Sequence, residues 1–370
     1  MKIVLVGPFP PYRGGISMFN HSLAKELEKT HDVHRISFSL QYPKILFPGK
    51  TQYFDFKGEP SKELINSINP LSWIKTANYI KKLSPDLIVF QYWMSFFAPA
   101  FNSIVKHVKK DCNVKIMVNC NNIKSHEPKP GDNILTKSFF KNCDLFMVMS
   151  SVVEQELKSL VTKPNYKKSP HPIYDIFGNQ VSKKNARDEL KLGDEKIILN
   201  FGLVRDYKGL DTLINAAKTI KNKINNFKIL VVGECYGDQQ KYLKLAYKNN
   251  VDDVIDFRFG FVPNEIVNYY FCASDLVILP YRSASQSGIV PIAYHFNKPV
   301  IVTNVGGLPE VVEIGKSGLV CEPTVKDISQ NIIDLLNSDL TSYNKYISEY
   351  KNNFSWSSFS KNMLELAIVY

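Results

Sequence analysis

The sequence predicts an α/β protein with two doubly wound parallel-sheet domains. Short apolar runs typical of buried strands alternate with segments of helical periodicity along most of the chain. A charged stretch with several prolines at residues 163–188 interrupts this alternation, which then restarts, so this stretch is the candidate linker. The length of 370 residues also exceeds that of one typical domain. We therefore expect one domain over residues 1–172 and a second over residues 173–353, facing each other across a cleft.

The first half starts with an apolar strand at residues 2–6, a loop rich in glycine and proline, and a helix at residues 16–27. A doubly wound sheet binds its ligands at the carboxyl ends of its strands, so the loops after the strands are where a site is expected. The other strands of this half are expected at 31–38, 86–91, 114–120 and 145–149, and its helices at 64–83, 96–110 and 134–141.

The second half repeats the alternation and ends in an amphipathic segment. Residues 354–370 carry apolar side chains at helical spacing, and we expect this tail to pack back on the first domain. The apolar positions are Trp356, Phe359, Met363 and Leu366. Strands are expected at 197–201, 228–232, 254–257, 276–279 and 300–303, and helices at 210–221, 239–248, 264–272, 289–296 and 328–337.

The composition is ordinary for a soluble globular protein, with 44% hydrophobic and 22% charged residues. No run reaches the roughly 18 apolar residues of a membrane span, and proline breaks the start of the chain too early for a signal peptide. We therefore expect a cytoplasmic protein. Six cysteines without metal-ligand spacing are interpreted as reduced core thiols: Cys112, Cys120, Cys143, Cys235, Cys272 and Cys321.

The excess positive charge is confined to the first half. Residues 1–172 contain 24 lysines and arginines against 13 acidic residues, whereas residues 173–370 contain 22 of each. Such an asymmetry suggests an anionic partner, either a membrane surface or an acidic substrate; a solvated lysine-rich surface is the plain alternative. The chain has no nucleic-acid recognition motif with interleaved aromatic residues, so nucleic acid is not an expected partner.

The stretch from Asp275 to Gly307 is interpreted as strand, turn, helix and strand, and its turn at Ser287-Gly288 is a candidate anion site. Glycine lets a ligand approach the backbone closely, and the first amides of a helix have no partner within the helix. The positive end of the helix dipole adds to the attraction for an anion. An ordinary tight connection has the same sequence pattern, so the turn alone does not decide between the two.

Arg205 and Lys208 directly follow the strand at 197–201, in a loop that opens the next helix. Two cations fixed there, beside a second anion-binding turn at Ser287-Gly288, predict a cradle for a diphosphate. The sequence has no Asp-x-Asp motif, which agrees with a site that uses neither a metal nor another cofactor. A solvated pair of surface cations is the alternative, and two phosphate-suited loops in one domain argue against it.

Other loops contain glycine at strand ends. Gly14 and Gly15 open the helix at 16–27, where amides at the sheet edge suit a phosphate or a sugar, although the loop is not a GxGxxG dinucleotide fingerprint. In the second half Gly202 and the pair Gly233-Glu234 follow strands and belong to the same expected binding edge.

Several longer runs of the chain go beyond single motifs. In the second half they are NFGLVRDYKGLDTLINA, LVVGE, FGFVPNEIVNYYFCASDLVILPYRSASQSGIV and KPVIVTNVGGLPEVVEIGKSGLV, and in the first half GPFPPYRGGI, FQYW, NNIKSHE and HPIYDIF. In combination these runs resemble the retaining nucleotide-sugar glycosyltransferases of family 4. The resemblance implies the GT-B architecture, with two Rossmann-like domains, an acceptor-binding first domain and a second domain that binds a nucleotide diphosphate sugar.

The resemblance also implies roles for individual residues. Arg205 and Lys208 would bind the donor diphosphate, and Gly14 and Gly15 would face its phosphate nearest the sugar. Phe261 and Val262 would meet the base. The backbone amides given to the diphosphate would be those of Ser287, Gly288, Ile289 and Val290.

The sequence departs from the family pattern around the turn. The family commonly has two glutamates eight positions apart, one at the donor sugar and one at the ribose, and alignment on Gly288 puts Ser285 and Ala293 there. Ser285 or Gln286 can only partly replace a carboxylate as acceptor of hydroxyl hydrogen bonds. Glu310 is the remaining carboxylate near the turn.

A second departure lies in the first domain, where a family histidine falls on Asn121. His126 and Glu127 are then the nearby titratable pair. We expect His126 to contact the acceptor, with a structural role as the alternative.

Together these features predict a retaining, metal-independent enzyme of the hexosyltransferase type. It would move a sugar from a nucleotide diphosphate sugar to a hydroxyl of a glycan or lipid-linked acceptor, in the synthesis of cell-surface polysaccharide. The positive half would suit peripheral contact with the anionic inner face of the cell membrane. Two alternatives remain, namely a GT-B nucleotide-sugar epimerase and a binding or regulatory subunit without catalysis.

Overall fold

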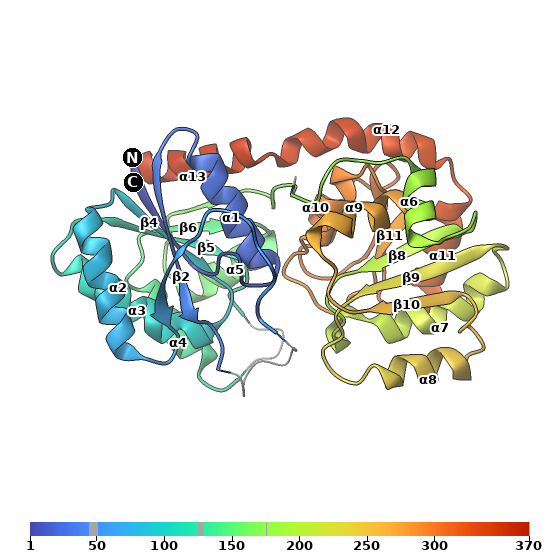
Figure 1. Cartoon of the computed structure of the whole chain (residues 1–370), viewed down its shortest axis with the longest axis horizontal. Helices are drawn as coiled ribbons and strands as arrows, with labels where there is room; N and C mark the ends of the chain where they lie inside the picture. The colour runs from blue at the N-terminus through green and yellow to red at the C-terminus, as the bar shows by residue number, and fades with distance from the viewer. Residues whose placement is uncertain (44–50, 125–128, 175, 370) are drawn as a thin grey trace. The chain divides into compact units, whose positions relative to one another are not determined.

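The computed structural model describes residues 1–43, 51–124, 129–174 and 176–369. The chain divides into two compact units (Figure 1). The N-terminal unit comprises Met1–His171 together with Trp356–Tyr370, and the C-terminal unit comprises Pro172–Ser355. Each unit is an α/β structure around one parallel sheet, as the sequence predicts.

The sheet of the N-terminal unit has seven strands in the order β3-β2-β1-β4-β5-β6-β7, and all of its neighbouring strands are parallel. The order runs outward in both directions from β1 and β4, which is the doubly wound topology. The strands are β1 (Lys2–Val6), β2 (Asp32–Leu40), β3 (Lys62–Asn66), β4 (Leu87–Tyr92), β5 (Lys115–Cys120), β6 (Leu145–Val148) and β7 (Tyr166–Lys168).

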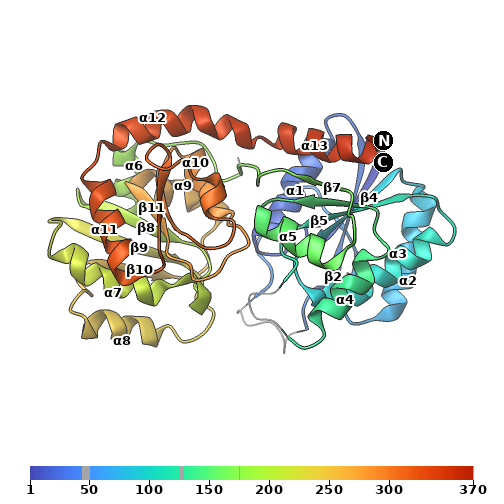
Figure 2. The same cartoon turned by 180° about the vertical axis from the view of Figure 1, so that it is seen from behind.

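Helices cover both faces of this sheet (Figures 1 and 2). On one face the helices α2, α3 and α4 pack side by side, and elsewhere α1 packs against α13. The helices are α1 (Gly15–Leu27), α2 (Pro70–Leu83), α3 (Ala98–Lys109), α4 (Asp132–Phe140), α5 (Ser151–Leu160) and α13 (Trp356–Val369), with a short 3-10 helix η2 (Ser95–Phe97) before α3.

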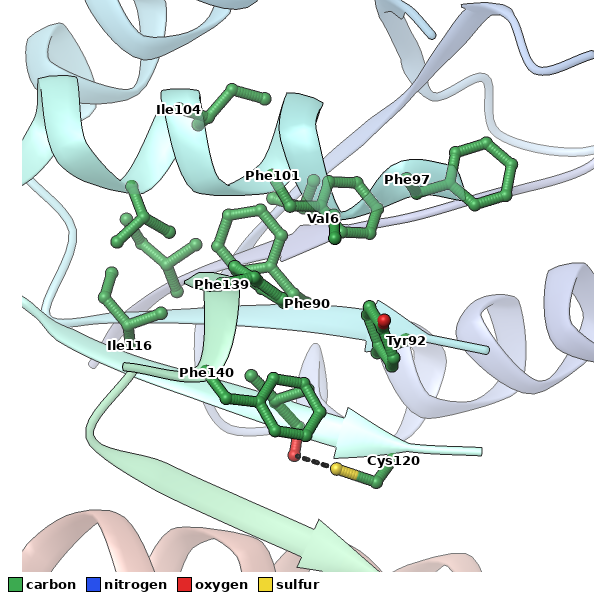
Figure 3. Packing of buried hydrophobic residues seen from close by; sticks show 14 of the residues in the cluster. Val6, Phe90, Tyr92, Phe97, Phe101, Ile104, Ile116, Cys120, Phe139 and Phe140 are labelled. Atoms are coloured by element: carbon green, nitrogen blue, oxygen red, sulfur yellow. Dashed lines mark hydrogen bonds between the residues drawn. The ribbon is translucent and has the colours of Figure 1, made fainter. Parts of the chain in front are cut away.

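The core of the N-terminal unit is rich in aromatic rings. Phe90 of β4, Phe101 of α3 and Phe139 of α4 meet with ring centroids 5.1 to 5.7 Å apart (Figure 3). Such tilted and edge-to-face contacts add to the stabilisation that burial gives. At the edge of this cluster the Cys120 thiol donates a hydrogen bond to the Val118 carbonyl oxygen at 3.9 Å (Figure 3). This cysteine is therefore a free core thiol, as predicted.

The sheet of the C-terminal unit has six parallel strands in the order β10-β9-β8-β11-β12-β13. Its order reverses between β8 and β11, at the centre of the sheet. The strands are β8 (Lys196–Phe201), β9 (Phe227–Gly233), β10 (Ile255–Phe259), β11 (Leu276–Leu279), β12 (Val300–Thr303) and β13 (Gly318–Cys321).

The helices of the C-terminal unit include long connectors between the strands and three 3-10 segments. Their packing encloses a second apolar core, in which Ile198, Val231 and Ile278 are fully buried. The helices are α6 (Lys183–Leu190), α7 (Leu210–Lys221), α8 (Gln240–Lys248), α9 (Asn264–Ala273), α10 (Ile289–His295), α11 (Val325–Leu336) and α12 (Leu340–Tyr350), with η3 (Asp206–Lys208), η4 (Pro309–Val311) and η5 (Lys351–Phe354).

The helix predicted at residues 64–83 begins later in the structure. Residues 64–66 belong to the edge strand β3, and helix α2 begins only at Pro70. Proline fits the first turn of a helix, and the Asn69 side chain accepts a hydrogen bond from the Leu71 amide at 3.0 Å, so this helix has a clear start signal. The apolar residues before α2 were assigned to the same helix because a strand as short as β3 shows too few residues for its own hydrophobic alternation to be recognised.

The predicted linker is also partly wrong. Residues 163–188 contain β7 and most of α6, so the irregular connection is shorter than expected. Besides β3 and the 3-10 helices, five elements were not predicted, because each is short or polar: α5, β7, α6, β13 and α12. By contrast the tail forms helix α13, whose apolar face is buried as predicted. Its Trp356 and Phe359 rings lie 5.0 and 5.5 Å from the ring of Phe19 in α1.

Candidate active site

The strand order of the second sheet reverses between β8 and β11, and the candidate site lies at the carboxyl edge of these two strands. The loops after β8 (residues 202–209) and after β11 (residues 280–288) leave neighbouring strands at this point. In open α/β sheets such a switch point is where ligands bind, because the two connections leave to opposite faces of the sheet. Arg205 and Lys208 are on the first of these loops, and Ser287 and Gly288 are on the second.

The two loops are packed tightly onto each other. Gly209 adopts φ +69°, and a Cβ atom there would lie 2.0 Å from the carbonyl oxygen of Pro280. The Arg282 amide donates a hydrogen bond of 2.7 Å to the Tyr207 carbonyl oxygen. Only glycine permits this approach, so the loop that carries the cations is held directly against the end of β11.

Lys208 points to the start of α10. A Cβ atom on Gly202 would lie 3.6 Å from Lys208 Nζ and 3.3 Å from Ile289 Cδ1, so the ammonium group and the first residue of α10 flank the same glycine. The ammonium group also lies 5.1 Å from the ring centroid of Tyr281. The structure therefore brings together Lys208, Gly202 and Ile289, three of the residues that the sequence assigned to one site.

Arg205 lies over an aromatic ring from the neighbouring strand connection. Its guanidinium carbon is 5.1 Å from the ring centroid of Tyr236. Two backbone hydrogen bonds join the segment of Tyr236 to the Arg205 loop. The Val204 amide donates to the Glu234 carbonyl oxygen (2.9 Å), and the Tyr236 amide donates to the Val204 carbonyl oxygen (3.0 Å). Arg205 is thus held on the side of the loop toward β9.

The acidic residue between the two cations is engaged elsewhere. The Asp206 carboxylate pairs with Lys241 of α8 and accepts a hydrogen bond from Tyr242 Oη at 3.3 Å. The hydrogen bond from Lys241 is the main reason why the pKa of Asp206 lies below its usual range. The carboxylate that lies between the two cations in the sequence is therefore paired with a lysine of another helix, α8.

The Ser287-Gly288 corner differs in detail from the expectation. Gly288 has helical angles (φ −67°, ψ −9°), which any residue can adopt, so its backbone does not require glycine. The Ile289 amide donates to Ser287 Oγ at 3.2 Å, so this first helical amide has a partner within the chain. Helix α10 continues through the buried Val290 and is short, with seven residues.

The residues at the two family glutamate positions are buried. Ser285 is 3% exposed and Ala293 is fully buried, while Gln286 between Ser285 and the corner is half-buried. Ala293 therefore packs in the core and presents no side chain to a ligand. The loop 280–288 is further fixed because a Cβ atom on Gly306 would lie 1.5 Å from the Ala284 carbonyl oxygen.

The remaining residues predicted for the donor lie around the same edge. Gly233 at the end of β9 would place a Cβ atom 2.1 Å from the Gly202 carbonyl oxygen, so these two glycines touch. Phe261, after β10, is 39% exposed, and Val262 beside it is half-buried. Glu310 is exposed on η4, after the loop that follows β12.

Gly14 and Gly15 lie in the N-terminal unit, exposed at the start of α1. Gly14 adopts φ +118°, a region that favours glycine. The loop before them is braced by an antiparallel bridge between Tyr12 and Tyr53, and the Arg13 amide donates to the Gln52 carbonyl oxygen at 2.8 Å. This loop follows β1, which neighbours β4 at the switch point of the first sheet.

Sequence reasoning missed a cluster of buried amide side chains below this loop. Gln91 Oε1 accepts hydrogen bonds from Asn119 Nδ2 (2.8 Å) and Asn121 Nδ2 (3.1 Å), and Gln91 Nε2 donates to Asn20 Oδ1 (3.3 Å). The position of the family histidine is therefore part of an uncharged network, with Asn121 5% exposed. The hydrophilic residues inside apolar strands were its only sequence signal.

His126 and Glu127 lie outside the described residues, so the expected acceptor contact of His126 stays a prediction. The segment before them is held by Glu156 of α5, whose carboxylate accepts a hydrogen bond from the Lys124 amide at 3.2 Å. Burial raises the pKa of Glu156 above its usual value.

Sequence reasoning missed two further residues at this sheet edge, Tyr281 and Arg282. They directly follow the buried strand β11, and this position after a central strand is the signal that could have found them. Across the described ranges, no group of three histidine, cysteine, aspartate or glutamate side chains is placed to hold a metal ion. The expectation of a metal-free site stays a prediction.

Comparison with known families supports a common origin for the site-bearing unit. Residues 181–354 match the model of the family described as Glycosyl transferases group 1. The chain is 26% identical over 374 residues to an uncharacterized glycosyltransferase of Methanocaldococcus jannaschii, with 96% of this chain and 95% of that one covered. It is 25% identical to spore coat protein SA of Bacillus subtilis, with 99% of each chain covered.

Solved structures show the same fold. Sucrose-phosphate synthase from Thermosynechococcus elongatus aligns with a TM-score of 0.76 at 17% identity, over 99% of this chain and 98% of that one. Anabaena HepE, solved in complex with UDP-glucose, aligns with a TM-score of 0.76 at 17% identity over the full length of both chains. The two parallel-sheet units and these structures show the GT-B fold, and the family match over residues 181–354 and the relatives support a glycosyltransferase.

Proposed function

We propose that this glycosyltransferase belongs to the retaining family 4 and moves a sugar from a nucleotide diphosphate sugar to an acceptor hydroxyl, without a metal. The observation that carries the proposal is the position of Lys208, whose ammonium group shares Gly202 with the first residue of α10 at the switch point of the second sheet. Arg205, three residues earlier, adds a second cation on the same loop. Two cations at such an edge suit the two phosphates of a nucleotide sugar.

Related proteins support the choice of donor. The Anabaena protein HepE was solved with UDP and with UDP-glucose, and it shares the fold over its whole length. A relative from Bacillus anthracis, 26% identical over 84% of this chain, is an N-acetyl-alpha-D-glucosaminyl L-malate synthase. A nucleotide diphosphate sugar is therefore the donor class that we propose for this chain.

The proposed reaction follows from where charge develops. As the bond between sugar and diphosphate breaks, negative charge builds on the leaving phosphate, and Arg205 and Lys208 would stabilise it. Losing one preorganised group of this kind costs about 3 kcal/mol of transition-state stabilisation. The leaving phosphate would take the proton of the acceptor hydroxyl on the face that it leaves, so that the new bond keeps the configuration of the donor.

A screen of nucleotide sugars tests the proposal. The purified chain is heated with UDP-, GDP-, ADP- and dTDP-sugars, because a ligand that binds the folded state raises the unfolding midpoint. The best donor is then incubated with glycan and lipid-linked acceptors, and the anomeric configuration of the first product is read by NMR. We expect release of nucleoside diphosphate and a product with the configuration of the donor; an inverted product would contradict the retaining mechanism.

The same experiment separates the two alternatives. An epimerase would form a new sugar nucleotide without an acceptor and without releasing nucleoside diphosphate. A regulatory subunit would show a raised unfolding midpoint but neither transfer nor slow donor hydrolysis. If none of the nucleotide sugars changes the midpoint or is consumed, the proposed donor class is wrong.

We further propose that the acceptor is lipid-linked or part of a cell-surface glycan, and that the N-terminal unit meets an anionic membrane. Large apolar side chains are exposed just before helix α2 and in the first turns of α2 and α4: Ile68 (55%), Leu71 (67%), Ile74 (37%), Ile134 (75%) and Leu135 (40%). Residues 64–85 contain three lysines and no acidic residue. Exposed apolar groups beside lysines suit an anionic lipid surface. None of the described helices has the length and apolarity of a membrane-crossing segment.

Sedimentation with vesicles tests this contact. We expect binding to vesicles with phosphatidylglycerol at low salt, weaker binding to neutral vesicles, and a loss in the double variant L71S/I134S. Tyr247, 75% exposed on α8 of the other unit, provides the matched control Y247S, which should bind as the wild type does. Equal sedimentation with neutral and anionic vesicles would exclude the proposed surface.

A further inference from the structure

We propose that Arg282 is a positioning residue of the donor site, which fixes the Arg205–Lys208 loop against the loop that ends in Ser287-Gly288. This inference rests on the proposed function, since it concerns the binding of the same diphosphate. Arg282 is the first exposed residue after β11, and the cations that it would position are on the loop after β8.

The contacts of Arg282 all lead to one place. Its amide donates to the Tyr207 carbonyl oxygen (2.7 Å), and Nη1 donates to the Asp206 carbonyl oxygen (3.0 Å). Its Nη2 donates to Asp211 Oδ2 (2.5 Å) and to Thr212 Oγ1 (3.0 Å), in the first turn of α7. The Arg282 side chain thus contacts both the 3-10 helix η3, which follows Arg205 and includes Lys208, and helix α7 after it.

This number of contacts is unusual for a side chain that is 45% exposed. A solvated surface arginine gains little from one ion pair and loses rotamer freedom, so ordinary exposed pairs contribute little. The planar guanidinium fork offers several donors in fixed directions, and a lysine cannot reproduce this geometry. The contact of the Arg282 guanidinium with the Asp206 carbonyl oxygen of η3, together with its two contacts in α7, therefore indicates a role in holding the loop rather than in solvation.

A comparable arginine, Arg187, lies at the opposite, amino ends of strands β8 and β11. Arg187 donates to the Ala273, Gly193 and Glu195 carbonyl oxygens and pairs with Asp275, just before β11 begins. Arg187 ties the amino edge of β8 and β11, where no ligand is proposed, whereas Arg282 ties the carboxyl edge. The chain thus supplies its own control for the effect of losing a multiply bonded arginine.

Loss of Arg282 should free the Arg205–Lys208 loop without removing a group that touches the ligand. The loop would remain attached through Gly209 and the Tyr207 carbonyl contact, so the unit should fold. The cations would spend less time in the binding geometry, and the diphosphate would be bound less tightly. The base, expected near Phe261 after β10, would be bound as before.

The test compares nucleotides that differ by one phosphate. The full chain and the variants R282Q, R282K and R187Q are titrated calorimetrically with UDP, ADP and GDP, and with the matching monophosphates. For R282Q we expect the diphosphate Kd to rise about tenfold and the monophosphate Kd to change less than twofold, with R282K close to R282Q. For R187Q we expect a lower Tm but the wild-type ratio of the two Kd values.

Two results would overturn the inference while leaving the proposed function intact. One is an R282Q variant whose diphosphate affinity equals that of the wild type, and the other is an equal loss for diphosphate and monophosphate. If R282Q does not fold, R282K carries the test with the same readout. A wild-type chain that binds none of these nucleotides would instead refute the proposed function, and with it this inference.

Discussion

The ammonium group of Lys208 lies 5.1 Å from the centre of the Tyr281 ring. Tyr281 is 3% exposed, and its position is fixed on two sides. Thr303 Oγ1 donates to its carbonyl oxygen at 2.6 Å, and its ring meets that of Tyr207 at 6.3 Å. A cation over an aromatic face gains about 1 kcal/mol, so the ring both attracts and aims the lysine.

The first prediction concerns this ring. We expect Y281L to weaken donor binding about five- to tenfold, because the aromatic face that orients Lys208 is lost. Y281F should bind the donor as the wild type does. Since Tyr281 Oη is buried and has no hydrogen-bond partner in the described part of the chain, Y281F should also unfold at the same temperature or a higher one. Donor titration and thermal unfolding measure the two effects, and equal donor affinity in Y281L and Y281F would contradict the role of the ring.

The second prediction concerns the cations themselves. R205A and K208A should each reduce turnover about a hundredfold, because each variant removes a group that stabilises the leaving diphosphate. Lys221, which pairs with Asp253 at the far end of α7, gives the control K221A with near-normal turnover. Steady-state rates with saturating donor decide the matter, and normal transfer by R205A would show that the assigned cradle is wrong.

The third prediction is that transfer needs no metal. We expect Arg205 and Lys208 to supply the positive charge that a divalent ion supplies at other diphosphate sites. Transfer rates should therefore stay within about twofold of the untreated rate after dialysis against EDTA. A loss of activity that Mg²⁺ or Mn²⁺ restores would contradict the metal-free mechanism.

The fourth prediction concerns the contact between the two loops. G209A should destabilise the C-terminal unit by at least about 2 kcal/mol, because its Cβ atom would meet the Pro280 carbonyl oxygen and its φ is +69°. G237A is the matched control, since Gly237 also has a positive φ (+122°) but has open space around its Cβ position. Chemical denaturation should rank G209A well below G237A, and equal stability would show that the contact is dispensable.

The fifth prediction concerns pH. Burial lowers the pKa of Lys298 to about 8, although its ammonium group donates to the Cys272 and Ser274 carbonyl oxygens at 3.2 and 2.7 Å. The unfolded chain keeps this proton up to pH about 10.4, so it binds more protons than the folded chain between these values. The contribution of Lys298 to stability should therefore rise as the pH rises from about 8 to about 10.

The comparison with K298M isolates this effect, because other groups titrate equally in both proteins. The free energy of unfolding of the wild type minus that of K298M should increase over this pH range, by up to about 3 kcal/mol. A difference that stays constant from pH 7 to pH 10 would mean that Lys298 titrates normally.

The sequence predicts correctly those parts of the fold in which the pattern of apolar residues is pronounced. The unit from β11 to β12 has its predicted strand ends, because two buried strands flank a short helix and a glycine-containing turn. The short edge strand β3 and the three-residue β7 were missed, since pairing with a neighbour decides such strands and leaves little local pattern.

The sequence analysis identified the cations of the candidate site but not the residues that hold them in place. Arg205 and Lys208 stand out because cations follow a strand directly. Tyr281 and Arg282 act on them through contacts between loops some 75 residues apart in the sequence, such as the hydrogen bond from Arg282 to Asp206. The amide cluster around Gln91 is likewise assembled from separate strands and a helix, and only the topology brings its members together.

Helix α13 makes the N-terminal unit discontinuous in the sequence, since Trp356–Tyr370 completes a body that begins at Met1. During synthesis, the first 171 residues leave the ribosome long before the helix that covers Phe19 exists. The C-terminal unit can therefore fold before the N-terminal unit is complete, and until α13 is made the apolar surface around Phe19 stays uncovered. A chain that ends at Ser355 should therefore aggregate through its incomplete N-terminal unit rather than through its C-terminal unit.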